Sequence, residues 1–252
     1  MGDGQGLDGV FVTGTGTEVG KTVVAAVLAR SWAAGGARVA VFKPAVSGLD
    51  EDRGDGDSSR LPDHALLRLA AGSTQSDEEI APYRYGPPVS PHLGAELAGE
   101  GIEPSLLARA ARAAASSADR LVCEGVGGLM VPLTLGYLVR DFARELELPV
   151  VIAASPGLGT INHTLLTIEA ARAVGLEVAL VVLTPWPNAP SAVERSNREA
   201  IERLGAVRVE SLPELDLGAP ESWPPLRLRG GARGRQGLGT RRGAGPHRGV
   251  RL

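Results

Sequence analysis

The sequence predicts an α/β fold with a mostly parallel sheet and helices on both faces. Apolar runs of strand length alternate along the chain with segments in which Ala, Val and Leu recur at helical spacing. The runs are almost continuously apolar, as strands buried on both faces are expected to be. Because 43% of the 252 residues are hydrophobic, the chain can bury one sizeable core.

The first elements follow the order strand, helix, strand. Val10–Thr13 is a short apolar run, and a Gly/Thr-rich loop comes after it. Lys21–Ala34 has helical spacing and stops before two glycines, which are poor helix formers. Arg38–Phe42 is the next predicted strand, and a lysine-proline pair ends it.

The middle of the chain is expected to be less regular. Residues 47–60 are polar, acidic and rich in glycine, which predicts a mobile loop. Residues 82–91 contain four prolines, and this segment is expected to be irregular because proline lacks a backbone donor. Helices are predicted at Asp63–Ala71 and Pro104–Ser116.

Strands and helices alternate again from residue 121. The predicted strands are Leu121–Cys123, Pro149–Ala154, Val178–Leu183 and a short Val207–Val209, and the predicted helices are Thr160–Val174 and Ala192–Leu204. Ligands of such sheets bind beyond the carboxyl ends of the strands. Five residues lie at or just before those ends: Thr13, Lys43, Glu124, Ala154 and Leu183.

Charge is unevenly distributed along the chain. The net charge is −3, although residues 227–252 hold many arginines and glycines and no acidic residue. We therefore expect residues 1–226 to form one acidic domain, which argues against nucleic acid as a partner. Residues 227–252 are expected to be a disordered Arg/Gly-rich tail without a catalytic role.

Membrane and disulfide features are absent from the sequence. The apolar runs are shorter than a membrane span, and the first residues lack the pattern of a secretory signal. Cys123 is the only cysteine, so no intramolecular disulfide can form, and we expect it to be a buried core residue. The histidines lack metal-ligand spacing, and His92 is expected to lie in a loop. We expect a cytoplasmic protein with no membrane partner.

The strongest motif is GTGTEVGKT, Gly14–Thr22, between a predicted strand and a predicted helix. Its glycines let the backbone curl around phosphate, its lysine can bind the β- and γ-phosphates, and its last hydroxyl can bind Mg²⁺. The helix adds the positive end of its dipole. The spacing between Gly14 and Gly20 is one residue longer than usual. The sequence thus predicts a variant P-loop NTPase fold that binds ATP or GTP.

Lysine is almost absent, because Lys21 and Lys43 are the only two lysines among 26 lysine and arginine residues. A lysine ammonium is a compact point charge, and the planar arginine fork cannot replace it at a tight phosphate site. The alternative, which needs no function, is a compositional bias that replaced lysine by arginine wherever either residue was adequate. The contrast favours a functional role for both lysines.

Mg²⁺ prefers oxygen ligands, so a P-loop enzyme also needs carboxylates. Glu124 ends an apolar strand, where the second acidic motif of P-loop enzymes lies, and glycines at 125 and 127 allow phosphate to approach. Asp63, at the start of a predicted helix, is a second candidate, although Asp is also an ordinary residue there. The guanine-reading NKxD segment of switch GTPases is not present. The residues by themselves leave the phosphoryl acceptor open.

Several motifs together resemble the dethiobiotin synthetase family. They follow the order and approximate spacing of that family, including its longer P-loop, and the resemblance covers roughly residues 8–216. The motifs are GTGTEVGKT at residues 14–22, FKPAVSG at 42–48, PVSPHL at 88–93, CEGVGGLMVPL at 123–133 and GLGTINHTLLT at 157–167.

The resemblance implies a reaction in which 7,8-diaminopelargonate, CO2 and ATP give dethiobiotin, ADP and phosphate, with Mg²⁺ as cofactor. One substrate amine captures CO2 as a carbamate. A carbamate oxygen then attacks the γ-phosphate, and the second amine closes the ureido ring and expels phosphate. Such chemistry depends mostly on positioning and charge neutralisation.

The resemblance also implies the site residues. Lys21 and Lys43 are the implied catalytic residues; Thr22, Asp63 and Glu124 are the implied metal ligands; Thr17, Lys43 and Ser47 are implied to contact the substrate. Thr184 and Pro185 stand where the family often has an Asn-Asp pair that reads adenine, and residues 212–215 resemble a loop that closes over the base. The implied nucleotide contacts are Gly16, Thr17, Glu18, Val19, Gly20, Lys21, Thr22, Val23, Asp63, Glu124, Gly125, Val126, Gly127, Thr184, Pro185, Pro213, Glu214 and Leu215.

A further motif implies a homodimer with shared active sites. In the family, the loop that matches residues 157–162 comes from the partner subunit and receives the substrate carboxylate, so Gly159 and Asn162 are implied substrate contacts. A helix N-terminus is a natural anion site. A simple helix-capping role for Asn162 remains an alternative.

Three other functions compete with this interpretation. A cobyrinate-type amidase would bring a glutaminase domain with a cysteine nucleophile, and Cys123 is predicted to be in a strand. A ParA-like partitioning ATPase carries an extra lysine near the start of its P-loop, where this chain has Thr15. An inactive homologue that has lost nucleotide binding is the third.

Overall fold

The computed structural model describes residues 7–50 and 61–228. Most of the predicted loop at 47–60 and all but the first two residues of the predicted tail lie outside this part of the chain. A six-stranded sheet forms the centre, and its order is β10-β9-β8-β1-β5-β2 with every neighbouring pair parallel. Its strands are β1 (Gly9–Gly14), β2 (Val39–Phe42), β5 (Arg120–Gly128), β8 (Val150–Ala154), β9 (Val178–Leu183) and β10 (Val209–Ser211).

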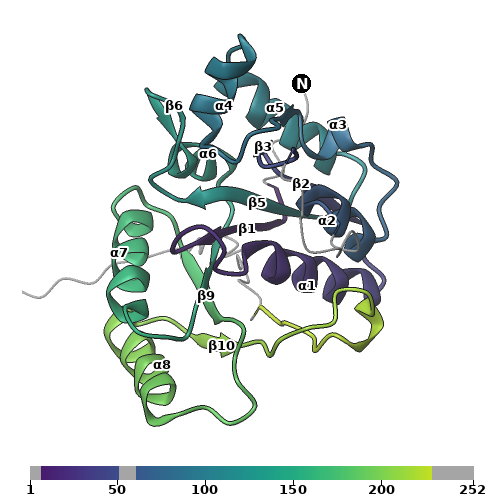
Figure 1. Ribbon diagram of the computed structural model, residues 1–252. Helices are drawn as coiled ribbons and strands as arrows, with labels where there is room; N and C mark the ends of the chain where they lie inside the picture. The colour runs from purple at the N-terminus through teal and green to yellow at the C-terminus, as the bar shows by residue number, and fades with distance from the viewer. Residues whose placement is uncertain (1–6, 51–60, 229–252) are drawn as a thin grey trace, which may run out of the picture.

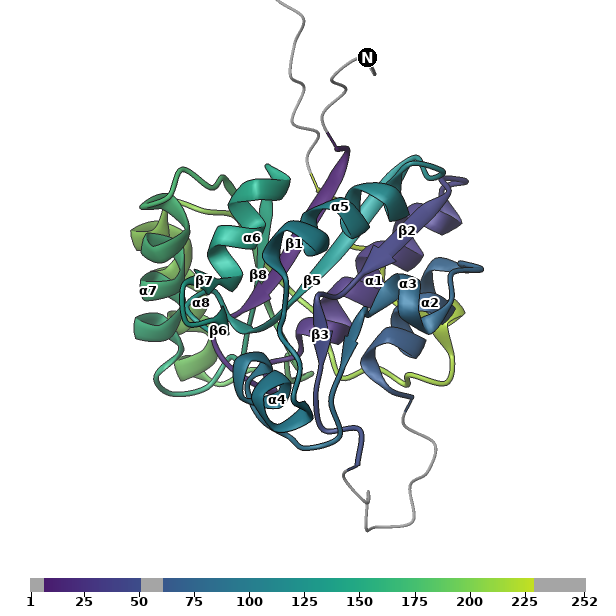
Figure 2. The same cartoon turned by 90° about the horizontal axis from the view of Figure 1, so that it is seen from above.

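Helices lie on both faces of this sheet (Figures 1 and 2). Helices α1 and α2 pack on one face together with the C-terminal segment, whereas α4 to α8 contribute to the core on the other face. The helices are α1 (Lys21–Ala34), α2 (Asp63–Ala71), α3 (Asp77–Ile80), α4 (Pro91–Ala98), α5 (Pro104–Ala115), α6 (Val139–Leu146), α7 (Thr160–Arg172), α8 (Ala192–Gly205) and the short 3₁₀ helix η1 (Pro220–Ser222). No described helix has the length and apolar character needed to cross a membrane.

The alternation of side chains along the strands divides the core in two. In β1, Phe11 points to the α5–α6 side, whereas Val10 and Val12 point to the α1 side. Successive side chains of a strand point to opposite faces, so a strand that is covered on both faces must be apolar at every position. This is the physical reason for the continuous apolar runs in the sequence.

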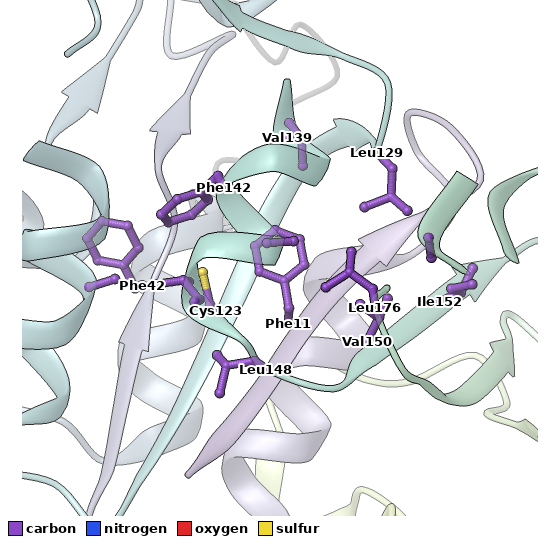
Figure 3. Packing of buried hydrophobic residues seen from close by; sticks show 14 of the residues in the cluster. Phe11, Phe42, Cys123, Leu129, Val139, Phe142, Leu148, Val150, Ile152 and Leu176 are labelled. Carbon is purple, nitrogen blue, oxygen red and sulfur yellow. The ribbon is translucent and has the colours of Figure 1, made fainter. Parts of the chain in front are cut away.

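Three phenylalanines anchor the core on the α5–α6 side. Phe142 of α6 lies edge-on to Phe11 of β1, with ring centroids 5.9 Å apart, and its centroid is 6.1 Å from that of Phe42 in β2. Cys123 is buried among these rings (Figure 3). The expectation for Cys123 is therefore confirmed, and burial raises the pKa of its thiol well above the ordinary value.

The predicted fold class is confirmed, and the bounds of most predicted elements agree to within two residues. β5 differs by more, and β10 is displaced by two residues. β5 continues through Glu124 to Gly128, so Glu124 does not end the strand as predicted. β10 begins at Val209 instead of Val207. The glycines after Glu124 have low strand propensity, but pairing with β1 as far as Gly14 extends the strand through them.

Several short elements were not predicted. The proline-rich segment 82–91 is not wholly irregular, because Tyr83–Arg84 forms β4, which pairs with β3 (Ala45–Val46). His92 lies in the first turn of α4 and not in a loop. Proline at the start of that helix is tolerated because the first N–H groups have no intrahelical partner. The other unpredicted elements are α3, α6, β6 (Pro132–Thr134), β7 (Tyr137–Leu138) and η1.

Strand order places a crevice at the carboxyl end of β1. From β1 the chain passes to β2 and β5 on one side, and then to β8, β9 and β10 on the other. Connections on the two sides leave β1 in opposite directions, and such a switch point opens a ligand crevice beyond the strand ends. The loop that follows β1, residues 15–20, is the centre of the motif Gly14–Thr22, so the fold directs the P-loop into this crevice.

Replacement of Phe142 by alanine is expected to destabilise the protein by about 3–5 kcal/mol, because it leaves a cavity between Phe11 and Phe42. Chemical unfolding monitored by circular dichroism measures this. The control is Leu135→Ala, since Leu135 is 88% exposed and its loss should change the unfolding free energy by less than about 0.5 kcal/mol. Equal effects of the two substitutions would contradict the described packing.

Candidate active site

The loop between β1 and α1 has the geometry of an anion cradle. Its last residue before the helix, Gly20, has φ 84°, and Glu18 also has a positive φ of 58°. Within the described part of the chain, none of the backbone N–H groups of residues 16–20 donates a hydrogen bond to another residue. Free N–H groups at the start of a helix, together with the helix dipole, bind anions such as phosphate.

Gly20 is needed for two separate reasons. A left-handed backbone disfavours residues with a Cβ. A Cβ at this position would also lie 2.5 Å from Cγ2 of Thr184, which follows β9. The P-loop therefore packs directly on the chain that leaves β9.

Lys21 is the first residue of α1 and bends back over the loop. Its Nζ donates to the carbonyl oxygen of Gly16 at 2.8 Å. Only 8% of the residue is exposed, and burial lowers the pKa of its ammonium. The lysine thus spans the cradle, where its charge can meet phosphate oxygens.

Lys43 lies at the centre of a charge cluster in which Lys43 and Glu124 are buried and Asp63 is partly exposed. Its Nζ is 2.6 Å from Oε1 of Glu124 and 2.6 Å from Oδ2 of Asp63. Thr22 donates its hydroxyl to the same Glu124 oxygen at 2.9 Å. Lys43 directly follows β2, Glu124 lies in β5, and Asp63 and Thr22 lie in the first turns of α2 and α1. They meet because the carboxyl ends of parallel neighbours lie at one edge of the sheet.

Burial and opposite charges act against each other in this cluster. Burial by itself would lower the pKa of Lys43, but Glu124 and Asp63 outweigh it and raise that pKa, so the ammonium stays charged. Burial would raise the pKa of Asp63, yet the Lys43 ammonium lowers it overall. Complete burial raises the pKa of Glu124, against the pull of Lys43. Removal of one partner would leave another charge buried without compensation.

The crevice is a cavity of about 920 Å³ beyond the strand ends. It brings together most of the residues that the sequence implied. The implied residues that line it are Thr17, Glu18, Gly20, Lys21, Thr22, Val23, Lys43, Ser47, Asp63, Glu124, Val126, Gly127, Thr184, Pro185, Pro213, Glu214 and Leu215. Gly16, Val19 and Gly125 do not line it.

Sequence reasoning missed several lining residues, all of them apolar or glycine. They lie next to implied residues in the chain, and that adjacency was the available signal. The missed residues are Ala45, Val46, Gly48, Leu49, Leu61, Pro62 and Leu217.

Gly159 and Asn162 do not line this cavity. Gly159 is the N-cap of α7, with φ 89°, so the alternative role of Asn162 as the cap is wrong. Asn162 is exposed in the first turn of the helix, and Leu158 beside it is 98% exposed. Within one chain these residues are separate from the charge cluster.

The site fits both Mg²⁺ and a nucleoside triphosphate. Among the described residues, no three His, Cys, Asp or Glu side chains are clustered as a metal cage. Mg²⁺ at nucleotide sites needs only one or two carboxylates, with phosphates and waters as the other ligands. Glu124 has a second oxygen, Oε2, that is buried and unpaired within the described residues, and Thr22 and Asp63 add further hard oxygens.

Comparison with known proteins agrees with this geometry. Residues 8–220 match the model of a family described as "AAA domain". The cell division ATPase MinD from Pyrococcus furiosus superposes with a TM-score of 0.51 over 84% of each chain, and at 17% identity it shows the fold alone. The class is therefore a P-loop nucleotide-binding protein.

Closer relatives define the family within that class. "ATP-dependent dethiobiotin synthetase BioD" from Bacillus cereus strain G9842 is 39% identical over 82% of this chain and 83% of its own length. The proteins of the same name from Bacillus subtilis strain 168 and Bacillus velezensis are 36% and 37% identical over 81% and 84% of this chain, and 85% and 89% of their own lengths. The chain belongs to the ATP-dependent dethiobiotin synthetase family.

Gly20→Ala is expected to weaken ATP binding about tenfold or more, because the clash with Thr184 must displace the P-loop. Isothermal titration calorimetry with Mg²⁺ and ATP measures the affinity. Gly36→Ala is the matched control: Gly36 has φ 88°, but its Cβ would have no neighbour within 4 Å. Both variants should lose about 1 kcal/mol of stability from backbone strain. Unchanged ATP affinity in Gly20→Ala would contradict the proposed role of the loop.

Proposed function

We propose that this chain closes the ureido ring of dethiobiotin from 7,8-diaminopelargonate and CO2 at the expense of ATP. The observation that carries the proposal is the buried Lys43, held between Glu124 and Asp63 at the edge of a P-loop cavity. Membership in the dethiobiotin synthetase family supports the same activity. The partitioning-ATPase and inactive-homologue alternatives are not favoured by these relatives.

The P-loop residues bind and orient the triphosphate. The backbone N–H groups of residues 16–20 and the N-terminus of α1 face the phosphates. Lys21, which bends back over the loop, neutralises the charge of the phosphates. Thr22, Asp63 and Glu124 would hold Mg²⁺, which when bound withdraws charge from the phosphate oxygens. Catalysis at this point is mostly positioning and electrostatic stabilisation.

Lys43 is suited to the developing negative charge. One amine of the diamine attacks CO2 and loses a proton, which gives a carbamate; a carbamate oxygen then attacks the γ-phosphorus and displaces ADP. The second amine attacks the carbamate carbon and expels phosphate, which closes the ring. At the second step two anionic groups must approach each other, and the ammonium of Lys43 lies at the wall where they would meet.

The neighbouring residues are proposed to hold the diamine. Ser47 and Thr17 present hydroxyl groups to the same cavity as Lys43. The apolar wall of Val46 and Leu49 suits the alkyl part of the substrate. The hydroxyls and the ammonium at one end of an apolar wall would orient the diamine end of the substrate, with its alkyl chain along the wall.

Homodimer formation is a second proposal. Leu158 and Leu166, 98% and 60% exposed, flank Asn162 at the start of α7, and exposed apolar side chains of this kind are common at interfaces. We propose that a partner subunit covers this helix, and that Gly159 and Asn162 complete the partner's site by binding the substrate carboxylate.

Three further proposals concern the domain boundary, the C-terminal tail and the location of the protein. Residues 1–226 are proposed to be one synthetase domain, and burial of Leu226 against α1 supports a boundary after it. Residues 227–252 are proposed to play no part in catalysis. A cytoplasmic location without nucleic-acid or membrane partners is proposed from the single buried cysteine and the acidic domain.

Phosphate release with ATP, Mg²⁺ and bicarbonate should depend on added 7,8-diaminopelargonate. Lys43→Ala should reduce that release about 100-fold or more, because one preorganised charge at the reacting oxygens is lost. Arg109→Ala, which removes an exposed positive charge of α5 outside the cavity, is the control and should behave as wild type. ATP binding without diamine-dependent release in the wild type would exclude the proposed reaction.

Shared active sites predict complementation between two inactive variants. In Lys43→Ala and in Asn162→Asp, every site of the homodimer carries one defect. A heterodimer has one site with both defects and one with neither, so random pairing of co-expressed chains should recover about a quarter of wild-type activity. Differently tagged chains and sedimentation velocity identify the mixed dimer. Recovery should fail if each subunit builds its site alone, and a monomer would refute the dimer outright.

A further inference from the structure

The C-terminal segment 212–228 returns along α1 after β10. Figure 1 shows it passing beside that helix at the edge of the molecule. Leu212, Trp223 and Leu226 are buried in the core on the α1 side, whereas Leu215 and Leu217 are only partly buried there. The segment has no regular structure before η1.

This segment also forms one wall of the cavity. Four of its residues, Pro213, Glu214, Leu215 and Leu217, line the space that the P-loop faces. Strand order decides which part of a nucleotide meets this wall. Lys43 and Glu124 lie on the β2–β5 side of β1, whereas the segment follows β10 on the opposite side. With phosphates at the P-loop and the reacting group at Lys43, the nucleoside must extend toward the wall.

Within the wall, the backbone N–H groups of Gly218 and Ala219 donate to Oδ1 and to the carbonyl oxygen of Asp216, at 2.9 and 3.3 Å. At its start, the backbone N–H of Leu212 donates to the carbonyl of Leu183 at 3.0 Å, and the N–H of Trp186 donates to the carbonyl of Leu212 at 2.7 Å. Asp216, in the middle of the wall, is exposed. An irregular, half-exposed segment needs a distant anchor to keep one conformation, because ordering each of its residues costs backbone conformational entropy.

Trp223 supplies that anchor. Its indole Nε1 donates to the carbonyl oxygen of Asp216 at 2.7 Å, and Asp216 stands between the two wall residues Leu215 and Leu217. The ring itself is 8% exposed and packs in the core on the α1 side. The side chain therefore joins the wall to a rigid helix.

A second contact fixes the position of Trp223 along the helix. The backbone N–H of Leu226 donates to Oγ of Ser31 at 3.1 Å, and that hydroxyl donates to the carbonyl of Val27 at 2.6 Å. Both helix residues belong to α1, whose first turn carries the P-loop lysine. The wall and the phosphate cradle are thus positioned by the same helix.

We propose that Trp223 is a positioning residue for nucleotide binding: its indole N–H holds the Asp216 carbonyl, and through it Leu215 and Leu217, against the nucleoside of ATP. Trp223 does not line the cavity and acts through these two residues. The proposal rests on the proposed ATP-dependent function and extends it to a residue outside the motifs of the sequence.

Trp223→Phe tests the proposal because it keeps an aromatic ring in the core and removes only the donor. Loss of one hydrogen bond of about 1 kcal/mol should raise the KM for ATP and the dissociation constant for ADP about fivefold. The kcat at saturating ATP and the KM for the diamine should not change. Trp32→Phe is the matched control, since Trp32 packs against the same core and its ring stacks under Arg120, outside the cavity.

Calorimetric titration with ADP separates this proposal from the proposed function, because it needs no turnover. A fivefold weaker ADP affinity in Trp223→Phe supports the anchor even if ring closure is not observed. Unchanged ADP affinity and unchanged ATP KM in a folded Trp223→Phe, or equal losses in Trp32→Phe, would overturn it. Equal changes in both KM values would also overturn it, because a general loosening of the fold would produce them. Thermal melting curves verify that both variants are folded.

Discussion

The ion cluster formed by the buried Lys43 and Glu124 with the partly exposed Asp63 is the constraint on which the site depends. A charged amine with 4% exposure is tolerated only where opposite charges compensate it, and here two carboxylates do so at 2.6 Å. The three residues are far apart in sequence and come from different elements. Only a parallel sheet with β2 next to β5 brings them to one edge. The strand order of the fold therefore determines where the charged groups of the site lie.

The position of β1 between the two halves of the sheet divides the cavity into regions with different tasks. On the side of β5 and β2 lie the charged groups, which suit phosphoryl transfer. On the side of β9 and β10 lie Pro185, Pro213 and the leucines of the C-terminal wall, which are suited to contact with a nucleoside. In the proposed binding mode, the phosphates of a nucleotide that spans both regions lie across the P-loop, with the γ-phosphate toward Lys43.

Helix α1 contacts both the P-loop and the C-terminal wall of the cavity. It begins at the P-loop lysine, covers one face of the sheet, and receives the C-terminal segment through Ser31. Close packing around its apolar residues makes it a rigid reference for both the phosphate cradle and the nucleoside wall. The irregular segment after β10 can therefore contribute to a precise site without regular structure of its own.

Much of this protein could be predicted from its sequence because the signals are local. The apolar runs and the glycines of the P-loop are visible in short stretches of sequence, and the rarity of lysine is visible in the composition. The sequence determined the α/β class and the P-loop, and it singled out Lys21 and Lys43, both of which line the cavity. Tertiary structure decided the rest: that β5 extends through Glu124, that short strands such as β3 and β4 pair, and that the indole of Trp223 donates to the carbonyl oxygen of Asp216 beside the cavity wall. These features depend on contacts between residues distant in the chain, and neither periodicity nor spacing records such contacts.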